Sequence, residues 1–302
     1  MKKVLKWIGI ILGILIVVII VSVYMLTRKA DKMMVRKFEI TPQYFSITSD
    51  SVSIARGKAL SQLCKECHGE QLEGFAFFND KAVGVLNAPN LTKGRGSATI
   101  NYQDVDWIRS IRHGVRPNGD GLMVMPADDY ANLSKEDIGG LISYLKTLPP
   151  VDHEPQKNYL TVLGKVLLAT GQIGKNGELF AASVIDHSKP LVEAMPIAAT
   201  TEYGEYVMNI SGCKTCHGPQ LNGGKSPNPN SPPVPNLTPA GNLSKWSAEQ
   251  FTTTLRTGLT PEGKQLQKEF MPYTAFTSLS DEEMTALYMY IKTLPSVPTP
   301  KS

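Results

Sequence analysis

Outside its first 40 residues the sequence has no excess of basic residues, which argues against a nucleic-acid binder. The 302 residues include 31 Lys and Arg against 27 Asp and Glu, a formal net charge of +4. Eight basic and two acidic residues fall within residues 1–40, which therefore carry a net charge of +6. The remaining 262 residues hold 23 basic and 25 acidic groups. A polyanion needs a basic surface patch, so we expect no nucleic-acid partner.

Other absences narrow the class of protein further. The 25 Gly and 21 Pro follow no period, which excludes a collagen-like chain. With 42% hydrophobic and 19% charged residues, the composition is globular rather than disordered. The length allows about two domains, and beyond the N-terminal region no stretch is long and apolar enough to span a membrane.

The long apolar stretch lies near the N-terminus. Residues 7–26 carry no charge, and a helix of that length spans about 30 Å, the thickness of a hydrocarbon core. A cleaved signal peptide is the alternative, but its apolar region is usually shorter, and Arg28 suits a signal peptidase site poorly. Three Lys within the first six residues favour a cytoplasmic N-terminus. We therefore predict an uncleaved single-pass anchor and an exported body.

All four cysteines lie in two copies of one motif. The copies are Cys64-Lys65-Glu66-Cys67-His68 and Cys213-Lys214-Thr215-Cys216-His217. A C-x-x-C-H run is the attachment signature of c-type haem. Thiols three positions apart lie on one face of a helical turn, so both can form thioethers with the vinyl groups of one porphyrin, and the adjacent His reaches the iron.

Two alternatives exist for these cysteines. The four thiols could bind one zinc ion, or each pair could be a redox dithiol. A single zinc leaves both histidines without a role and joins pairs 149 residues apart. The dithiol hypothesis does not explain a His after each pair. We therefore predict two covalently bound haem c groups. Bacteria attach haem covalently outside the cytoplasm, which places the haem domains on the periplasmic side of the inner membrane.

The sequence around the two motifs is also repeated, at offsets of 144–149 residues. The matching segments are Ala88-Pro89-Asn90-Leu91-Thr92 with Val234-Pro235-Asn236-Leu237-Thr238, Ile111-Arg112-His113-Gly114 with Leu255-Arg256-Thr257-Gly258, and Met125-Pro126 with Met271-Pro272. The repeat predicts an anchor at 1–30, a linker at 31–50, a first haem domain at 51–151, a connector at 152–200, a second haem domain at 201–297 and a tail at 298–302.

Helix signals are duplicated too. Ser134 and Ser280 have the position of N-caps with an acidic residue three positions later. The apolar residues that follow recur at i, i+3, i+4 and i+7, which predicts amphipathic helices. Shorter helices are predicted at about 103–112 and 248–256, and before each C-x-x-C-H from about 52 and 202. No convincing strand alternation is present, so we expect a mainly α body.

The second axial ligand of each iron is predicted from the repeat. Met125 lies 57 residues after His68, Met271 lies 54 residues after His217, and both precede Pro. A thioether ligand suits an electron carrier and raises its potential. Since the chain has 11 Met, core packing is the alternative. Met123 competes with Met125 but has no counterpart in the second half.

Other residues receive secondary roles. We expect the carbonyl groups of Pro89 and Pro235 to accept the N–H of the axial His and so fix its tautomer. His113, His153 and His187 are not part of the repeated pattern, because His113 aligns with a Thr and the other two lie in the connector. We interpret these three as solvated or hydrogen-bonded residues rather than ligands.

Together these motifs resemble class I c-type cytochromes. The Pro-Asn-Leu-Thr, Arg-x-Gly and Met-Pro segments are similar to those of the cytochrome subunits of membrane-bound dehydrogenases that oxidise alcohols or sugars. The resemblance covers about two thirds of the chain. It implies two tandem cytochrome c-like domains, which follow the transmembrane helix predicted from residues 7–26. Those subunits commonly carry three haems, whereas this chain has two attachment motifs, so the specific partner stays open.

The functional expectation is single-electron relay, without bond chemistry on a substrate. The donor would be a dehydrogenase or a quinol-oxidising complex, and the acceptor a downstream cytochrome or oxidase. A di-haem peroxidase is the alternative, but it needs one open iron, whereas each half here supplies its own His and Met. A redox sensor would bring a signalling domain, and none is visible. The apolar run at 159–169 is expected to form a helix packed between the domains, with partner docking as the alternative.

Overall fold

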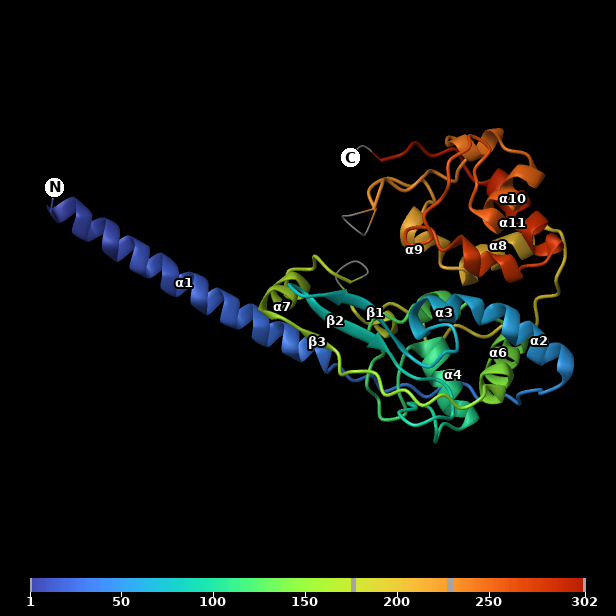
Figure 1. Cartoon of the computed structure of the whole chain (residues 1–302), viewed down its shortest axis with the longest axis horizontal. Helices are drawn as coiled ribbons and strands as arrows, with labels where there is room; N and C mark the ends of the chain where they lie inside the picture. Colours follow the sequence, from blue (N-terminus) through green and yellow to red (C-terminus); the bar gives the residue numbers. More distant parts are fainter. Residues whose placement is uncertain (1, 175–177, 227–230, 301–302) are drawn as a thin grey trace.

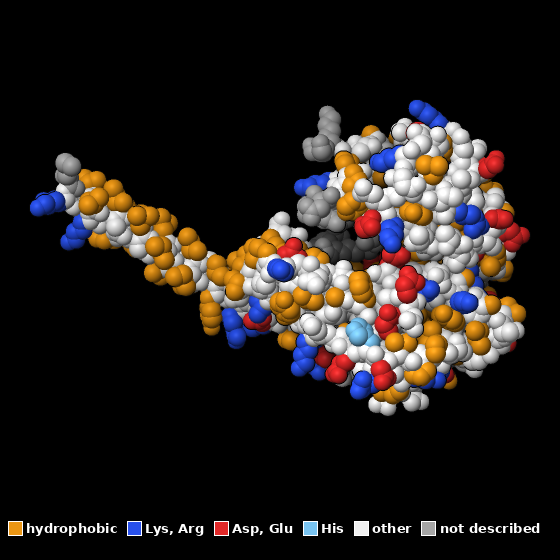
Figure 2. Space-filling view, viewed as in Figure 1, with side chains coloured by type: hydrophobic (Ala, Val, Ile, Leu, Met, Phe, Trp, Pro, Cys, Tyr) orange, Lys and Arg blue, Asp and Glu red, His pale blue; other side chains and the backbone are white. Residues whose placement is uncertain are grey.

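One long helix, α1 (Lys2–Met34), projects from a body of two helical halves (Figure 1). The computed structural model describes residues 2–174, 178–226 and 231–300. The apolar side chains along the first two thirds of α1 are exposed, and Figure 2 shows them on the surface of the projecting rod. A helix that is apolar on every side and uncovered by protein suits a lipid environment. It continues past the predicted anchor boundary at residue 30 to Met34.

The first half is built around two crossing helices, α2 and α6. Its elements are α2 (Ser51–Leu60), α3 (Gln62–His68), β1 (Phe75–Asp80), β2 (Gly84–Ala88), α4 (Asp104–His113), α5 (Ala127–Tyr130) and α6 (Lys135–Thr147). A Cβ added to Gly57 would lie 2.0 Å from the carbonyl oxygen of Gly140, so the two backbones touch. The predicted N-cap is confirmed, because the Ser134 side chain accepts the N–H of Asp137.

The second half repeats this plan. Its elements are α8 (Thr201–Ile210), α9 (Cys213–His217), η2 (Asn242–Lys245), α10 (Ala248–Thr257), η3 (Tyr273–Ser278) and α11 (Asp281–Thr293). A Cβ on Gly204 would lie 2.0 Å from the carbonyl oxygen of Ala286, so α8 crosses α11 as α2 crosses α6. Ser280 and Glu283 form a reciprocal capping box. The helices predicted from the repeat are all present.

The body is mainly α, as predicted, but the first half also contains a small sheet that the sequence did not indicate. β1 pairs antiparallel with β2, which pairs antiparallel with the two-residue β3 (Tyr159–Leu160). β1 is mostly exposed and β2 is mostly buried. Alternation arises only where one face of a strand is buried and the other is exposed, so neither strand carries the pattern.

The helix of the connector lies elsewhere than predicted. α7 (Val162–Ala169) packs against the carboxyl end of α1, rather than between the two halves (Figure 1). The Lys29 Nζ donates to the carbonyl oxygen of Ala169 at 2.7 Å, and Lys165 pairs with Asp31 at 2.7 Å. The short helix η1 (Ala181–Ser183) follows in the connector.

The two halves share one hydrophobic core, which also holds charge. Buried side chains of α2, α6, α8 and α11 belong to a single cluster. At its edge, Arg56 of α2 contacts Asp137 of its own half at 2.8 Å and Glu283 of the other half at 2.7 Å. The Tyr206 hydroxyl donates to Asp137 at 2.6 Å. The halves are therefore joined by packing and by a buried polar network.

Candidate haem sites

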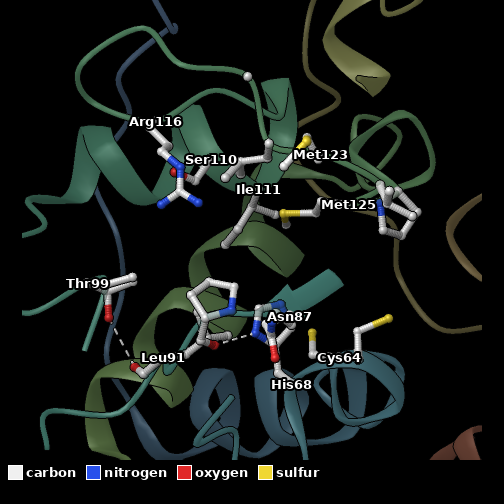
Figure 3. A pocket seen from close by; sticks show the side chains of 18 of the residues that line it. Cys64, His68, Asn87, Leu91, Thr99, Ser110, Ile111, Arg116, Met123 and Met125 are labelled. Carbon is white, nitrogen blue, oxygen red and sulfur yellow. Dashed lines mark hydrogen bonds between the residues drawn. The ribbon is translucent and has the colours of Figure 1, made fainter. Parts of the chain in front are cut away.

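A cavity of about 300 Å³ lies inside the first half. Its walls combine the motif residues with side chains from α4, α6 and the segment after β2. Figure 3 shows Cys64 and His68 on one side of the cavity, and Met125 extending into it from the opposite side. Most of the other lining residues are apolar. An apolar cavity with a few convergent donors is the ordinary form of a cofactor site.

His68 is oriented by a backbone carbonyl. Its Nδ1 lies 2.8 Å from the carbonyl oxygen of Pro89. Since that oxygen can only accept, Nδ1 carries the proton and Nε2 keeps a free lone pair. Gly69 follows with φ 86° and ends α3 there, a conformation that favours glycine. Burial lowers the pKa of His68, which favours the neutral ring that can bind a metal.

The second half reproduces this arrangement. The Nδ1 of His217 lies 2.9 Å from the carbonyl oxygen of Pro235. Gly218 has φ 82°, and burial lowers the pKa of His217 as well. The predicted hydrogen bonds from both histidines to proline carbonyls are therefore confirmed.

The Pro-Asn-Leu-Thr motif explains why the carbonyl lies there. The Oδ1 of the buried Asn90 accepts from the N–H of Thr92 at 2.9 Å and from its hydroxyl at 2.8 Å, while Nδ2 donates to Val151 O at 2.8 Å. Asn236 makes the same bonds to Thr238 and Val297. The side-chain amide thus ties the segment after Pro to the end of the domain. The repeat identifies this motif in the sequence, but only the folded structure shows which groups the Asn side chain connects.

The two methionines share a local geometry. The N–H of Ala127 donates to the carbonyl oxygen of Met125 at 2.8 Å, and that of Tyr273 donates to Met271 at 2.7 Å. Between them the prolines have φ and ψ of −78° and 54° or −74° and 60°, which is an inverse γ-turn. Both methionines lie half-buried against the core. The two Met-Pro segments therefore match in backbone conformation as well as in sequence.

Met123 lines the same cavity but differs in position. In Figure 3 its side chain lies on the far side of Met125 from His68. Val124 separates the two methionines with φ 63°, a strained value for a β-branched residue. Its N–H donates to Leu179 O at 2.6 Å. The turn at Val124 directs the two side chains differently, and the connector holds that turn in place.

The surroundings of the cysteines differ from those typical of a redox dithiol or a zinc site. All four are free of disulfides. Burial raises the pKa of Cys64 and of Cys213 to about 12, whereas a redox motif lowers it. Within residues 2–174, 178–226 and 231–300, no group of three or more His, Cys, Asp or Glu is arranged to hold a metal ion.

The remaining histidines are hydrogen-bonded, as predicted. His113 and His187 face each other with 2.9 Å between their Nδ1 atoms. His153 bonds the carbonyl oxygen of Glu73 at 3.0 Å.

Comparison with known families decides the identity of the two halves. A profile described as cytochrome c matches residues 54–149 and again residues 202–295. The chain belongs to the cytochrome c family. The predicted fold class and resemblance are confirmed: an apolar N-terminal helix precedes two mostly helical cytochrome c domains.

Three curated relatives are similar to this chain over most of its length. The fructose dehydrogenase cytochrome subunit of Gluconobacter japonicus is 25% identical over 266 residues, which cover 81% of this chain and 53% of the relative. A diheme cytochrome c-type protein of Cereibacter sphaeroides is 26% identical, over 71% of this chain and 73% of the relative. The cytochrome c subunit of alcohol dehydrogenase (quinone) of Gluconobacter oxydans is 23% identical, over 84% and 57%. The chain thus spans little more than half the length of the dehydrogenase relatives.

The residues present fit covalent haem c, the cofactor of cytochrome c domains. Each domain offers two thiols, a neutral imidazole with a free Nε2 and a thioether, which together are a complete donor set for one haem. The first domain adds an apolar cavity between the His and the Met.

Proposed function

We propose that this protein is a membrane-anchored di-haem cytochrome c that relays single electrons from a donor dehydrogenase or quinol-oxidising complex to a downstream acceptor. The observation that carries the proposal is the paired geometry of the two domains. Each has a His held by a proline carbonyl and a Met in a Met-Pro γ-turn. We propose domain bounds of 51–151 and 201–297.

Each domain's own residues divide the work between attachment and ligation. Cys64 and Cys67 would attach one haem, and Cys213 and Cys216 the other. The axial pairs would be His68 with Met125 and His217 with Met271. When bound, haem c supplies one-electron chemistry at iron. The proline carbonyls hold each imidazole in the Nδ1–H tautomer and make it a better donor. The apolar walls exclude water from the first site.

The helix α1 would anchor this cytochrome in the membrane. Its uncharged residues 7–26 have the length of a bilayer core, and all of them except Val23 and Leu26 are exposed in the structure. We propose a single-pass orientation in a bacterial inner membrane, with both haem domains on the periplasmic side. Fractionation tests this: the protein should stay with membranes at high salt, because hydrophobic burial is not screened. A soluble product that begins near residue 30 would contradict it.

The relatives support a dehydrogenase as the partner. Several are named as cytochrome c subunits of fructose, alcohol or gluconate dehydrogenases, so we propose a dehydrogenase as the electron donor. A peroxidase needs one iron with an open position. The matching Met-Pro turns in both domains favour two closed sites instead.

The haem count is the first test. Mass spectrometry should show two added haem masses, which acid-acetone does not extract because thioethers are covalent. Cys67→Ser and Cys216→Ser should each leave one haem held by a single thioether. One haem in the native protein would contradict the proposal.

The axial ligands are tested by spectroscopy of the oxidised protein. Two His/Met sites should give the weak near-infrared charge-transfer band from sulfur to ferric iron at the intensity of two haems. Met125→His should remove about half of that band and lower one potential, and Met271→His should do the same at the other haem, since imidazole stabilises ferric iron better than thioether does. Met123→Leu is the matched control and should leave the band unchanged. A high-spin ferric haem that reacts rapidly with peroxide would favour the peroxidase.

A further inference from the structure

The helix α7 is fixed to the end of the membrane helix. Lys29 donates to Ala169 O, and Lys165 pairs with Asp31. Ala30 and Leu168 are both 0% exposed where the helices meet. At 1.5 Å per residue, positions 29–31 lie within about 8 Å along α1 of Leu26, where the uncharged stretch ends. This is the depth at which hydrocarbon gives way to headgroups.

The outer face of α7 is apolar. Gly164, Leu168 and Ala169 are buried, whereas Val162 and Leu163 are 60% and 49% exposed. Lys165 is the single charged residue among the eight of the helix. A surface helix of a water-soluble domain normally turns polar residues outward, so this composition points to contact with a medium less polar than water.

A hairpin turn extends the same surface. The turn between β1 and β2 carries Lys81 and Ala82, both exposed, and Thr161 at the start of α7 bonds Val83 O with both its N–H and its hydroxyl. Figure 1 shows this turn and α7 at the end of the body from which α1 leaves. Figure 2 shows hydrophobic side chains gathered there, with Lys and Arg beside them.

The surroundings have the composition of a membrane interface. Tyr24 is 64% exposed on α1 at this level, and amphipathic aromatic rings prefer the headgroup region. Arg28, Lys29 and Lys32 follow within two turns. Such basic groups attract anionic lipid headgroups.

We infer that α7 and the turn at 80–84 rest on the lipid surface as a second, interfacial contact beside α1. The inference rests on the proposed membrane anchor. Its occupant is the bilayer surface, because the apolar face continues directly from the spanning helix and is fixed to it by the contacts of Lys29 and Asp31. Two contacts orient a body that a single helix would leave free to turn. Met34, the last residue of α1, and Arg36, just beyond it, line the first cavity, so the first haem site is held beside the bilayer.

The test uses the full holoprotein in vesicles of phosphatidylethanolamine and phosphatidylglycerol. Single cysteines are introduced for a nitroxide label, as the native thiols are held in thioethers. The positions are Leu163→Cys on α7, Val52→Cys on α2 as an equally apolar control that is 76% exposed, and Ile16→Cys in the middle of α1. Figure 1 shows α2 at the end of the body away from α1. Collision rates with oxygen, which enters lipid, and with a water-soluble nickel chelate report the depth of each label.

The expected result orders the three labels by depth. The Ile16 label collides mainly with oxygen, the Leu163 label shows an oxygen-to-nickel ratio several-fold above that of Val52, and the Val52 label behaves as in water. A Leu163 label equal to Val52, with Ile16 deep, overturns the interfacial contact and leaves the anchor standing. A water-exposed Ile16 label overturns the anchor itself. Val162→Cys lies on the same face and gives the reading if Leu163→Cys fails to fold.

Discussion

Arg56 and Glu283 form an ion pair across the boundary between the two cytochrome c domains, with 2.7 Å between Nη1 and Oε1. The side chains are 14% and 3% exposed. Asp137 is the counterpart of Glu283, each standing three residues after a capping Ser, and Arg56 contacts it at 2.8 Å. One guanidinium therefore pairs with the equivalent carboxylates of both domains and links the two domains directly.

Removing that guanidinium should destabilise the whole body. Arg56→Met leaves Asp137 and Glu283 buried without their cation, a change that costs about 3–5 kcal/mol. Denaturant unfolding of the holoprotein measures it. The control Arg95→Met removes an ion pair with side chains 81% and 62% exposed and should cost less than about 1 kcal/mol. Neutralising both acids together with Arg56 should recover much of the loss. Equal, small effects of Arg56→Met and Arg95→Met would contradict a structural role for the network.

The glycines at the helix crossings should resist even one methyl group. Gly57→Ala and Gly204→Ala place a Cβ 2.0 Å from a backbone oxygen, so the helices must separate, at a cost of about 1–3 kcal/mol. The matched control is Gly139→Ala on α6, where the nearest atom lies 3.9 Å away. There the gain in helix propensity should stabilise the fold by about 0.5–1 kcal/mol. Thermal unfolding compares the three variants, and a stabilised Gly57→Ala would show that the crossing is looser than the structure has it.

The motif asparagines should tune the haems one at a time. Asn90→Ala removes the bonds that place the Pro89 carbonyl against His68, and unsatisfied buried partners should cost about 2–4 kcal/mol. The weakened His68 hydrogen bond makes the imidazole a poorer donor, which should raise the potential of one haem. Asn236→Ala is the twin variant for the other haem. Potentiometric titration follows both haems. If neither potential changes in a variant, the Asn of the motif does not influence the axial His.

The sequence predicted the parts of this protein that are duplicated. Two copies of C-x-x-C-H, Pro-Asn-Leu-Thr and Met-Pro constrain one another, so the offset between copies located the helices and the proline carbonyls. Features without a copy were missed. Arg56 lies 227 residues from Glu283, and Tyr203 occupies its place in the second half, so no pattern linked the pair.

The sequence also did not indicate which elements pack against each other. The apolarity of 159–169 correctly indicated a helix. An apolar face can be buried against any neighbour, however, so the sequence did not show that this helix packs against α1. That position depends on β3, which ends at Leu160 just before the helix. In the sheet, β1 is mostly exposed and β2 is mostly buried, so neither shows the alternation on which strand prediction depends.

The pair formed by His113 and His187 should make the stability of the fold sensitive to acid. His187 Nε2 bonds Ala182 O at 2.9 Å, so His187 carries its proton there and accepts at Nδ1 from His113. Among the residues that the structure describes, the Nε2 of His113 is then a buried acceptor without a hydrogen-bond partner. Burial, reinforced by Arg112, His187 and Arg109, lowers the pKa of His113 from 6.5 to about 4. The folded protein therefore keeps this ring neutral where the unfolded chain protonates it.

The sign of the pH effect follows from that difference. Above pH 6.5 the ring is neutral in both states and contributes no pH dependence. As the pH falls from about 6.5 toward 4, His113 binds a proton in the unfolded chain but not in the folded protein. The free energy of unfolding therefore drops by up to about 1.4 kcal/mol per pH unit. His113→Thr, which installs the residue of the equivalent position 257, should flatten this part of the profile. Urea unfolding at pH 7, 5.5 and 4.5 compares the two proteins. Because the variant also loses the bond to His187, its stability at pH 7 should be lower, and the gap should close as the pH falls. A gap that stays constant would mean that His113 takes up its proton as readily in the fold as in the unfolded chain, contrary to its burial against Arg112.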